Sequence, residues 1–126
     1  MKEDIKNRED LLLLVTEFYK KLLADQSISY LFTDVAKIDL EHHLPVLVDF
    51  WDSILFQSNT YQKNAMQPHM VLHQQSPLQK NHFDTWLHHF TQTVDALFEG
   101  EKAFLAKERA RSIATVMHIK TIQWKG

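Results

Sequence analysis

Apolar residues recur every three or four positions along most of this chain, the spacing of helices that bury one face. In the first such stretch they are Leu11, Leu12, Val15, Phe18, Tyr19 and Leu22. Asn7 followed by Asp10 is typical of a helix start, because a capping side chain and an acidic first turn stabilise the free N–H groups there. The pattern predicts a helix over 7–24, then a short helix around 28–32 and a loop.

A second helix is predicted after Asp39. Its apolar face consists of His43, Leu47, Phe50, Trp51 and Ile54, at helical spacing. Pro45 interrupts this pattern, and because proline removes a backbone donor and crowds the preceding turn, we expect a kink or a helix boundary near His43. The polar stretch 57–63 is predicted to be a loop.

The second half of the chain predicts one short helix and two long ones. The short helix covers about 64–72, and 73–77 follows it as a loop. The next apolar stripe consists of Phe83, Trp86, Leu87, Phe90, Val94 and Leu97. Gly100 separates it from a last helix, whose face is made mostly of small residues: Ala103, Ala106, Ala110, Ile113, Ala114 and Met117. Small side chains let a neighbouring helix, or a flat ligand, approach closely.

Composition narrows the class of protein. The 126 residues fit one domain over 1–126, and two glycines and three prolines favour helices over a sheet, which needs more turns. The formal net charge of -2 indicates no nucleic-acid surface and no polybasic membrane anchor. The absence of cysteine excludes a disulfide scaffold, an iron–sulfur cluster and a thiol nucleophile. Without a signal-peptide pattern or a long apolar span, we expect a cytoplasmic protein that does not enter a membrane.

Eight histidines raise the question of a metal site. His69 and His73 are four apart and form a two-histidine clamp for zinc only if their helix continues past Leu72. The adjacent pairs His42/His43 and His88/His89 point about 100° apart on a helix and do not readily chelate one ion. We therefore expect five histidines on solvated faces: His42, His82, His88, His89 and His118. A zinc-dependent hydrolase is the weakest of the functions considered.

A haem-like set of residues remains after these exclusions. No phosphate-binding glycine loop and no serine nucleophile motif is present. Haem needs one strong axial ligand, usually histidine, and an apolar slot. Tyr19, His43 and Trp86 are candidate donors on apolar faces, although each is ambiguous when read alone, and tyrosine and tryptophan at such positions are more often ordinary core residues.

Several segments, in order along the chain, resemble one globin family. They are Glu17-Phe18-Tyr19, Leu31-Phe32, His42-His43-Leu44-Pro45, Phe50-Trp51, Asn64-Ala65-Met66-Gln67-Pro68-His69, Leu72-His73, Pro77-Leu78, His82-Phe83-Asp84-Thr85-Trp86-Leu87, Thr93-Val94-Asp95-Ala96-Leu97-Phe98-Glu99-Gly100-Glu101, Arg109-Ala110 and Ser112-Ile113-Ala114. This ordered set, from about 7 to 120, resembles the third group of truncated haemoglobins, which lacks the paired-glycine motifs of the other two groups. The resemblance implies an all-α truncated globin fold, a two-over-two helical sandwich around haem b (iron protoporphyrin).

The resemblance also implies a role for individual residues. His69 is the implied axial ligand of the iron. Four residues match the distal, gas-ligand side: Tyr19, His43, Leu47 and Trp86. The other implied haem contacts are Phe32, Trp51, Met66, Leu72, His73, Phe83 and Met117. A phenol O–H and an indole N–H would both stabilise a diatomic ligand that carries partial negative charge, since the indole nitrogen only donates.

The function implied is binding of a diatomic gas, O2, NO or CO, by a monomer or weak dimer. A polar distal side suits tight oxygen binding, or redox detoxification of NO or peroxide, more than oxygen delivery. Oxygen transport is nevertheless one of the functions that the resemblance implies. NO dioxygenase or peroxidase-like activity needs an external reductase, because the chain has no flavin domain. The alternative is a cofactor-free, globin-like helical sensor or interaction domain, in which Tyr19 and His43 need other buried partners or are exposed.

Overall fold

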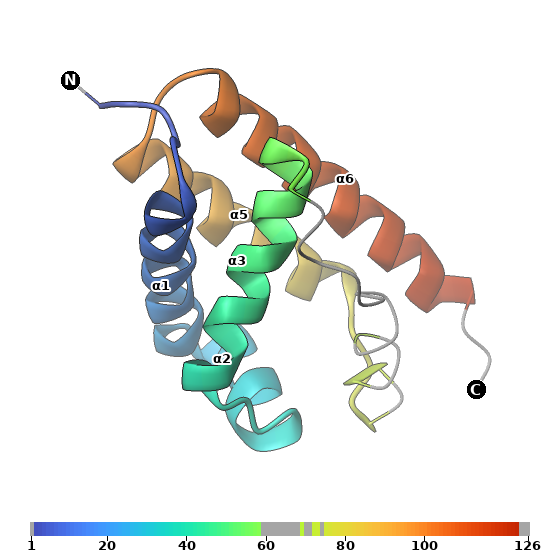
Figure 1. Cartoon of the computed structure of the whole chain (residues 1–126). Coiled ribbons are helices and arrows are strands. Elements are labelled where there is room, and N and C mark those ends of the chain that lie inside the picture. Colours follow the sequence, from blue (N-terminus) through green and yellow to red (C-terminus); the bar gives the residue numbers. More distant parts are fainter. Residues whose placement is uncertain (1, 59–68, 70–71, 74, 124–126) are drawn as a thin grey trace.

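Four long helices form the frame of the molecule in the computed structural model (Figure 1). They are α1 (Arg8–Ala24), α3 (Leu40–Phe56), α5 (Lys80–Leu97) and α6 (Glu101–Gln123). The short helix α2 (Gln26–Tyr30) and the π-helix η1 (Leu31–Val35) make the corner between α1 and α3. The structure describes residues 2–58, 69, 72–73 and 75–123, and it contains no strand within those ranges. The chain is therefore all-helical, as its apolar spacing predicts.

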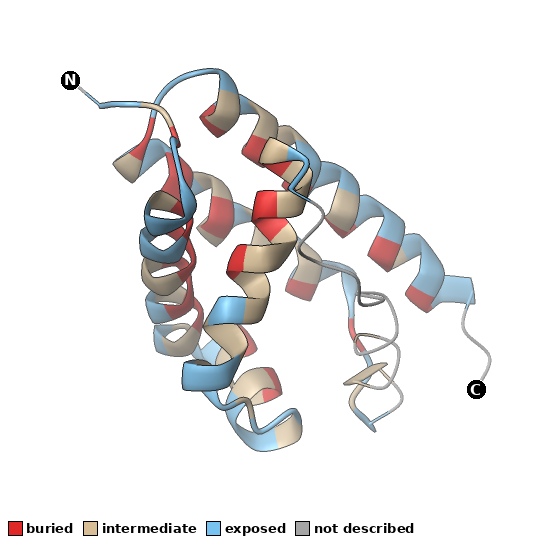
Figure 2. Cartoon of the chain, in the orientation of Figure 1, coloured by how far each residue is buried: buried red, intermediate tan, exposed pale blue. Residues whose placement is uncertain are grey.

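The long helices pack as two pairs, α1 with α3 and α5 with α6. Contacts of α1 with α5 and of α3 with α6 join the two pairs into the predicted two-over-two arrangement. The predicted small-residue face of α6 is buried at Ala103, Ala106, Ala110 and Ala114, whereas Ile113 is half-buried. Figure 2 shows that buried positions lie on the inner faces of the helices.

Polar side chains start the helices of the first half of the chain. The Asn7 side chain accepts from the Asp10 N–H at 3.0 Å, and Asp25 and Asp39 cap α2 and α3 in the same way. Each carboxylate or amide satisfies an N–H that has no partner inside its own helix. The predicted starts at Asn7 and Asp39 are confirmed.

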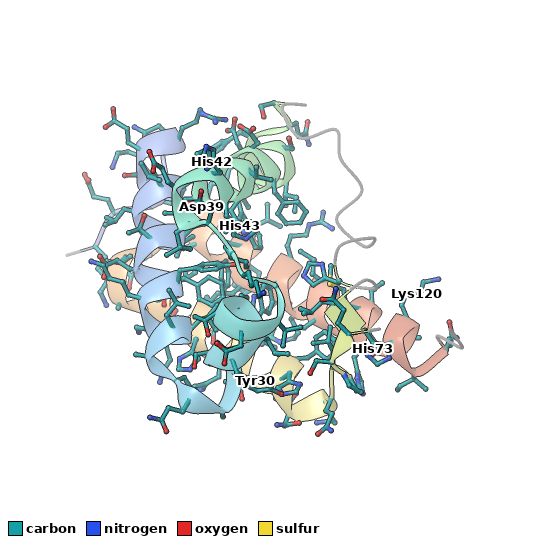
Figure 3. All side chains as sticks on the ribbon, turned by 90° about the horizontal axis from the view of Figure 1, so that it is seen from below. Tyr30, Asp39, His42, His43, His73 and Lys120 are labelled. Carbon is teal, nitrogen blue, oxygen red and sulfur yellow. The ribbon has the colours of Figure 1, made fainter. Side chains whose placement is uncertain are left out.

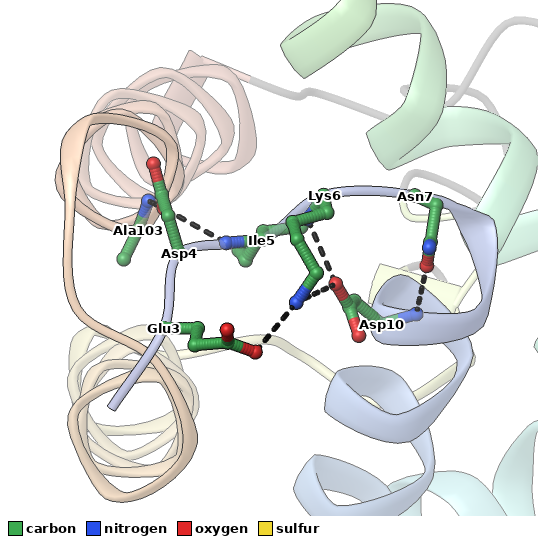
Figure 4. A network of polar contacts seen from close by, with 7 residues as sticks. All are labelled: Glu3, Asp4, Ile5, Lys6, Asn7, Asp10 and Ala103. Atoms are coloured by element: carbon green, nitrogen blue, oxygen red, sulfur yellow. Dashed lines mark hydrogen bonds and ion pairs between the residues drawn. The ribbon is translucent and has the colours of Figure 1, made fainter. Parts of the chain in front are cut away.

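The start of α6 is capped by a residue from the other end of the chain. Asp4 accepts the N–H groups of Lys102 and Ala103 at 2.9 and 2.8 Å, and Figure 4 shows Asp4 beside Ala103. A Cβ on Gly100 would lie 2.5 Å from Cγ of Asp4, and the φ angle of Gly100 is +144°. Glycine is needed here because both the close carboxylate and the backbone conformation exclude a side chain.

Three local expectations differ from the structure. No helix boundary occurs near His43, because α3 runs from Leu40 through Pro45 to Phe56. The buried face of α3 beyond the proline offsets the one hydrogen bond that Pro45 cannot make. The predicted loop after the short helix at 28–32 begins instead with the π-helix η1, and His73 and Gln75, predicted in a loop, are helical. The start of the helix expected at 64–72 lies outside the described residues.

None of the helices in the described ranges is long and apolar enough to cross a membrane.

Candidate functional site

Tyr19 on α1 and His43 on α3 meet across the interface of the first helix pair. The Tyr19 hydroxyl oxygen lies 2.9 Å from Nε2 of His43, and the two rings are 5.4 Å apart at 64°. Tyr19 is only 5% exposed, and His43 is half-buried. Figure 3 shows His43 nearer the middle of the molecule than its neighbour His42. The structure thus brings together two of the four predicted distal residues.

Burial keeps both members of this pair uncharged near neutral pH. It raises the pKa of Tyr19 far above its usual 10.0, so the phenol retains its proton. It also lowers the pKa of His43 below its usual 6.5, with a further contribution from the charge of His69. A neutral imidazole has one nitrogen that donates and one that accepts, so the hydrogen bond can run in either direction.

Aromatic rings surround the Tyr19–His43 pair. Phe32 on η1 packs edge-on against the Tyr19 ring at 5.5 Å. Phe18 contacts Tyr19 at 5.6 Å and Trp86 on α5 at 5.7 Å, so one phenylalanine separates the tyrosine from the tryptophan. Trp86 is half-buried, and its indole N–H has no hydrogen-bond partner within the described part of the chain.

Two further predicted residues lie on α3. Leu47 follows His43 by one turn and is half-buried. Trp51 is 3% exposed and stacks on Phe90 of α5 at 4.8 Å. Phe90 also stacks on Trp86, at 5.8 Å, so a phenylalanine lies between two indole rings in the core. This stack fixes α5 against α3 and thereby sets where Trp86 lies.

His69 is half-buried and helical, on the segment between α3 and α5. It lies close enough to His43 to influence the pKa of that imidazole, which places the predicted axial ligand toward the predicted distal pair. Leu72 and His73 follow it on the same segment and are also half-buried. The remaining residue predicted there, Met66, lies outside the described residues.

His73 is engaged by the backbone of its own segment. Its Nδ1 accepts the N–H of Leu78 at 2.9 Å, so the ring hydrogen of neutral His73 is on Nε2. Figure 3 shows His73 on the segment that leads to α5. Among the described residues, no group of three or more His, Asp or Glu side chains is arranged to hold a metal ion.

Phe83 of α5 and His118 of α6 meet where the two helices pack, and Met117 precedes His118 on α6. The rings of Phe83 and His118 are 5.5 Å apart, and Met117 is 8% exposed. Within the described part of the chain, Nδ1 of His118 is buried without a hydrogen-bond partner, as is Nδ1 of His89. A buried ring nitrogen left without a partner costs free energy. His118 lies beside two residues that the sequence assigns to haem contacts.

Comparison with known proteins identifies the family. The family model described as bacterial-like globin matches residues 3–121. The chain belongs to the bacterial-like globin family.

This globin is similar along its whole length to a truncated haemoglobin. It is 23% identical over 128 residues to a group 3 truncated hemoglobin of Campylobacter jejuni, covering 99% of this chain and 97% of that protein. The crystal structure of the group III truncated hemoglobin from Campylobacter jejuni superposes with a TM-score of 0.85 at 21% identity. That match covers 100% of this globin and 99% of the other chain. The truncated globin fold predicted from the sequence is confirmed.

The described residues of the globin fit the cofactor that its family implies. The half-buried imidazole of His69 lies near enough to His43 of the neutral phenol–imidazole pair to affect its pKa, and aromatic rings pack against that pair. The unpartnered nitrogen of His118 lies beside Phe83, on a face that the sequence assigns to haem. Haem requires an axial ligand, usually histidine, and an apolar slot, whereas neutral donors suit a diatomic ligand of the iron. The structure thus contains the residue types of a haem site in compatible places.

The expectation that five histidines lie on solvated faces is only partly correct. His42 and His88 are exposed, but His82 is 7% exposed, and His89 and His118 are half-buried. His82 is buried because Nδ1 accepts the Gln79 N–H at 3.0 Å and Nε2 contacts the Tyr30 hydroxyl at 2.9 Å. His89 contacts Asp25 at 2.7 Å. Both partners come from α2 or its cap, far away in sequence, so helical spacing alone gives no signal for these contacts.

Proposed function

We propose that this globin binds haem b through His69 and takes up a diatomic gas, O2, NO or CO, beside Tyr19 and His43. The observation that carries the proposal is the 2.9 Å contact of a buried, neutral phenol with a neutral imidazole. When bound, haem iron supplies an open coordination position for a gas molecule. The protein's contribution is to hold that iron on one side and to present hydrogen-bond donors on the other.

The Tyr19–His43 pair can present a donor without breaking. If His43 carries its ring hydrogen on Nε2, it donates to the Tyr19 oxygen, and the phenol O–H is then free to donate to a ligand. The unpartnered indole N–H of Trp86 is a second donor. A hydrogen bond of this kind is worth about 1 kcal/mol or more. Two of them slow dissociation of a polar gas ligand on the order of tenfold or more.

A pocket with two donors favours retention over release. This globin is therefore suited to tight oxygen binding or to redox conversion of NO or peroxide, rather than to oxygen delivery. Redox conversion requires an electron donor, so we propose an external reductase as partner for that activity. His73, Phe32, Leu72, Phe83 and Met117 are proposed to contact the porphyrin, and Trp51 to support it from the core.

The experiment is a measurement of oxygen dissociation from the ferrous, haem-supplied protein. Tyr19→Phe removes one donor of about 1 kcal/mol and is expected to release oxygen about fivefold faster, and His43→Leu, which removes the partner that orients this donor, is expected to release oxygen faster as well. His42→Leu is the matched control, since His42 is the exposed neighbour of His43. Unchanged dissociation in Tyr19→Phe would remove Tyr19 from the gas site. A purified protein that takes up no haem, and shows no strong visible absorption band, would favour the cofactor-free sensor or interaction domain.

A further inference from the structure

Two histidines of α5 hold the short helix α2 in place. Nε2 of His82 lies 2.9 Å from the hydroxyl of Tyr30, at the end of α2, and Nε2 of His89 lies 2.7 Å from the carboxylate of Asp25, at its start. The histidines are seven positions apart, which places them on one face of α5 about two turns from each other. The helix α2 is thus fastened to α5 at both ends, and we call these two contacts the α2 clip.

The Tyr30 end of the clip requires a neutral imidazole. Nδ1 of His82 accepts the N–H of Gln79 at 3.0 Å, so the ring hydrogen is on Nε2 and is donated to the Tyr30 oxygen. Protonation adds a hydrogen to Nδ1, which then faces the Gln79 N–H and cannot accept from it. His82 is 7% exposed, and Tyr30 is the titratable group that faces it from α2. Within the described residues, His82 forms no ion pair with a carboxylate that would stabilise an added positive charge.

The Asp25 end of the clip differs from the Tyr30 end, because the partner of the histidine there is a carboxylate. Hydrogen bonds from His89 and Ser27 lower the pKa of Asp25 to about 2, so the carboxylate stays charged in mild acid. Lys21 of α1 lines the same surface pocket as Asp25 and His89. Because the Asp25 carboxylate stays charged in mild acid, the Tyr30 end is the part of the clip that mild acid opens.

The clip is connected to the candidate gas site through one side chain. The helix α2 continues directly into η1, whose residue Phe32 packs edge-on against the Tyr19 ring at 5.5 Å. The Tyr19 hydroxyl in turn bonds to His43. A shift of α2 relative to α5 moves the ring that supports Tyr19. Only Leu31 lies between Tyr30 and Phe32 in the sequence, so a displacement of Tyr30 is passed to Phe32 over one intervening residue.

We propose that the α2 clip positions Phe32, and through it the Tyr19 hydroxyl, and that acid opens the clip at the Tyr30–His82 contact. Tyr30 and His82 are positioning residues here, because both act through Phe32. The proposal deepens the proposed function, on which its relevance to gas binding rests. Burial lowers the pKa of His82 below its usual 6.5, so the neutral, closed form dominates at pH 7. This form is lost as the pH falls through the lowered pKa.

Backbone amide hydrogen exchange over residues 26–35 tests the clip directly. In the wild-type protein we expect exchange, corrected for its intrinsic pH dependence, to become about tenfold faster for each pH unit of acidification above the His82 pKa. Tyr30→Phe is expected to exchange faster already at pH 7. His82→Gln keeps a donor and an acceptor but does not titrate, so its exchange should not depend on pH. The matched control His88→Gln removes an exposed imidazole of the same helix and should follow the wild type.

The NMR signal of the Tyr19 ring, in protein carrying 13C-labelled tyrosine, tests the positioning step. The signal is assigned by its loss in Tyr19→Phe, and it should shift in Tyr30→Phe and on acidification of the wild type. It should not shift on acidification of His82→Gln. The proposal would be overturned if wild-type exchange did not depend on pH, or if exchange in His82→Gln depended on pH as in the wild type. It would also be overturned if the Tyr19 signal did not shift in Tyr30→Phe. Both readouts are independent of haem, so a failure to bind haem would refute only the proposed function.

Discussion

The Tyr19 hydroxyl and Nε2 of His43 lie 2.9 Å apart and join α1 to α3 through a buried hydrogen bond. Both groups are uncharged near neutral pH, since burial raises the pKa of the phenol and lowers that of the imidazole. Each side chain satisfies the other without a bound ligand. A cofactor-free globin needs buried partners for Tyr19 and His43 or must expose them, and this contact supplies such partners. The packing of these residues therefore does not distinguish a haem protein from a cofactor-free globin, whereas the visible absorption spectrum does.

A double-mutant cycle measures this contact. Tyr19→Phe and His43→Leu each remove one partner, and we expect a coupling free energy of about 0.5–1.5 kcal/mol in the stability of the folded protein. Urea unfolding of the two single variants and the double variant gives this value. Replacing His42, the exposed neighbour, in the same cycle should give no coupling. Strictly additive effects of Tyr19→Phe and His43→Leu would mean that the contact does not stabilise the fold.

Removal of the Asp4 cap should destabilise the protein in a way that depends on pH. Burial works to raise the pKa of Asp4, but the N–H groups of Lys102 and Ala103 outweigh it, and the pKa is lowered from 3.8. A carboxylate with a depressed pKa contributes stability above its unfolded value, and that contribution is lost as the pH falls through the folded value. We expect Asp4→Ala to lower the free energy of unfolding by about 0.5–2 kcal/mol at pH 7.

Asp4→Asn is the control for charge, because it keeps a hydrogen-bond acceptor and should lower the free energy of unfolding by less than Asp4→Ala does. Urea unfolding at pH 7 and pH 3 is the measurement. The difference between wild type and Asp4→Ala should narrow at pH 3, where protonation begins to remove the charge from the wild-type cap. A difference that stays constant between these pH values would contradict the assigned role of the carboxylate.

Gly100→Ala should be destabilising for two separable reasons. The φ angle of +144° is strained for any residue with a Cβ, and that Cβ would lie 2.5 Å from Cγ of Asp4. Strain of this kind costs about 1–3 kcal/mol. Thermal or urea unfolding of Gly100→Ala in two backgrounds separates the effects. The cost should fall in the Asp4→Gly background, which removes the clash and leaves the backbone strain, and an equal cost in both backgrounds would exclude the clash.

Local sequence signals predicted the frame of this molecule well. Caps at Asn7 and Asp39 and the small-residue face of α6 correspond to the observed helix starts and to the packing of α6. The helix boundary offered as one alternative near Pro45 is wrong, because packing of the buried face of α3 outweighs one missing hydrogen bond. The π-turn of η1 has no local signature, since it arises where the corner must join α2 to α3.

Contacts in the candidate site could be predicted from the sequence only where both side chains lie on apolar helix faces. Tyr19 and His43 come together because helical spacing places them on apolar faces that meet, whereas Phe32 was assigned only by the family resemblance. His82 and His89 were assigned to the surface, since their partners Tyr30 and Asp25 are more than fifty positions away in sequence. Polar contacts between distant helices depend on the angle at which those helices pack, and apolar spacing does not encode that angle.

The visible absorption spectrum of the ferrous protein, compared between wild type and His69→Ala, tests the central claim most directly. Wild type supplied with haem should show a strong band of histidine-ligated haem that shifts with carbon monoxide. His69→Ala should lose that ligation and regain it when free imidazole is added. His73→Ala, which removes the other histidine of the same segment, should keep the wild-type spectrum. An unchanged spectrum in His69→Ala would contradict the assignment of His69 as the axial ligand.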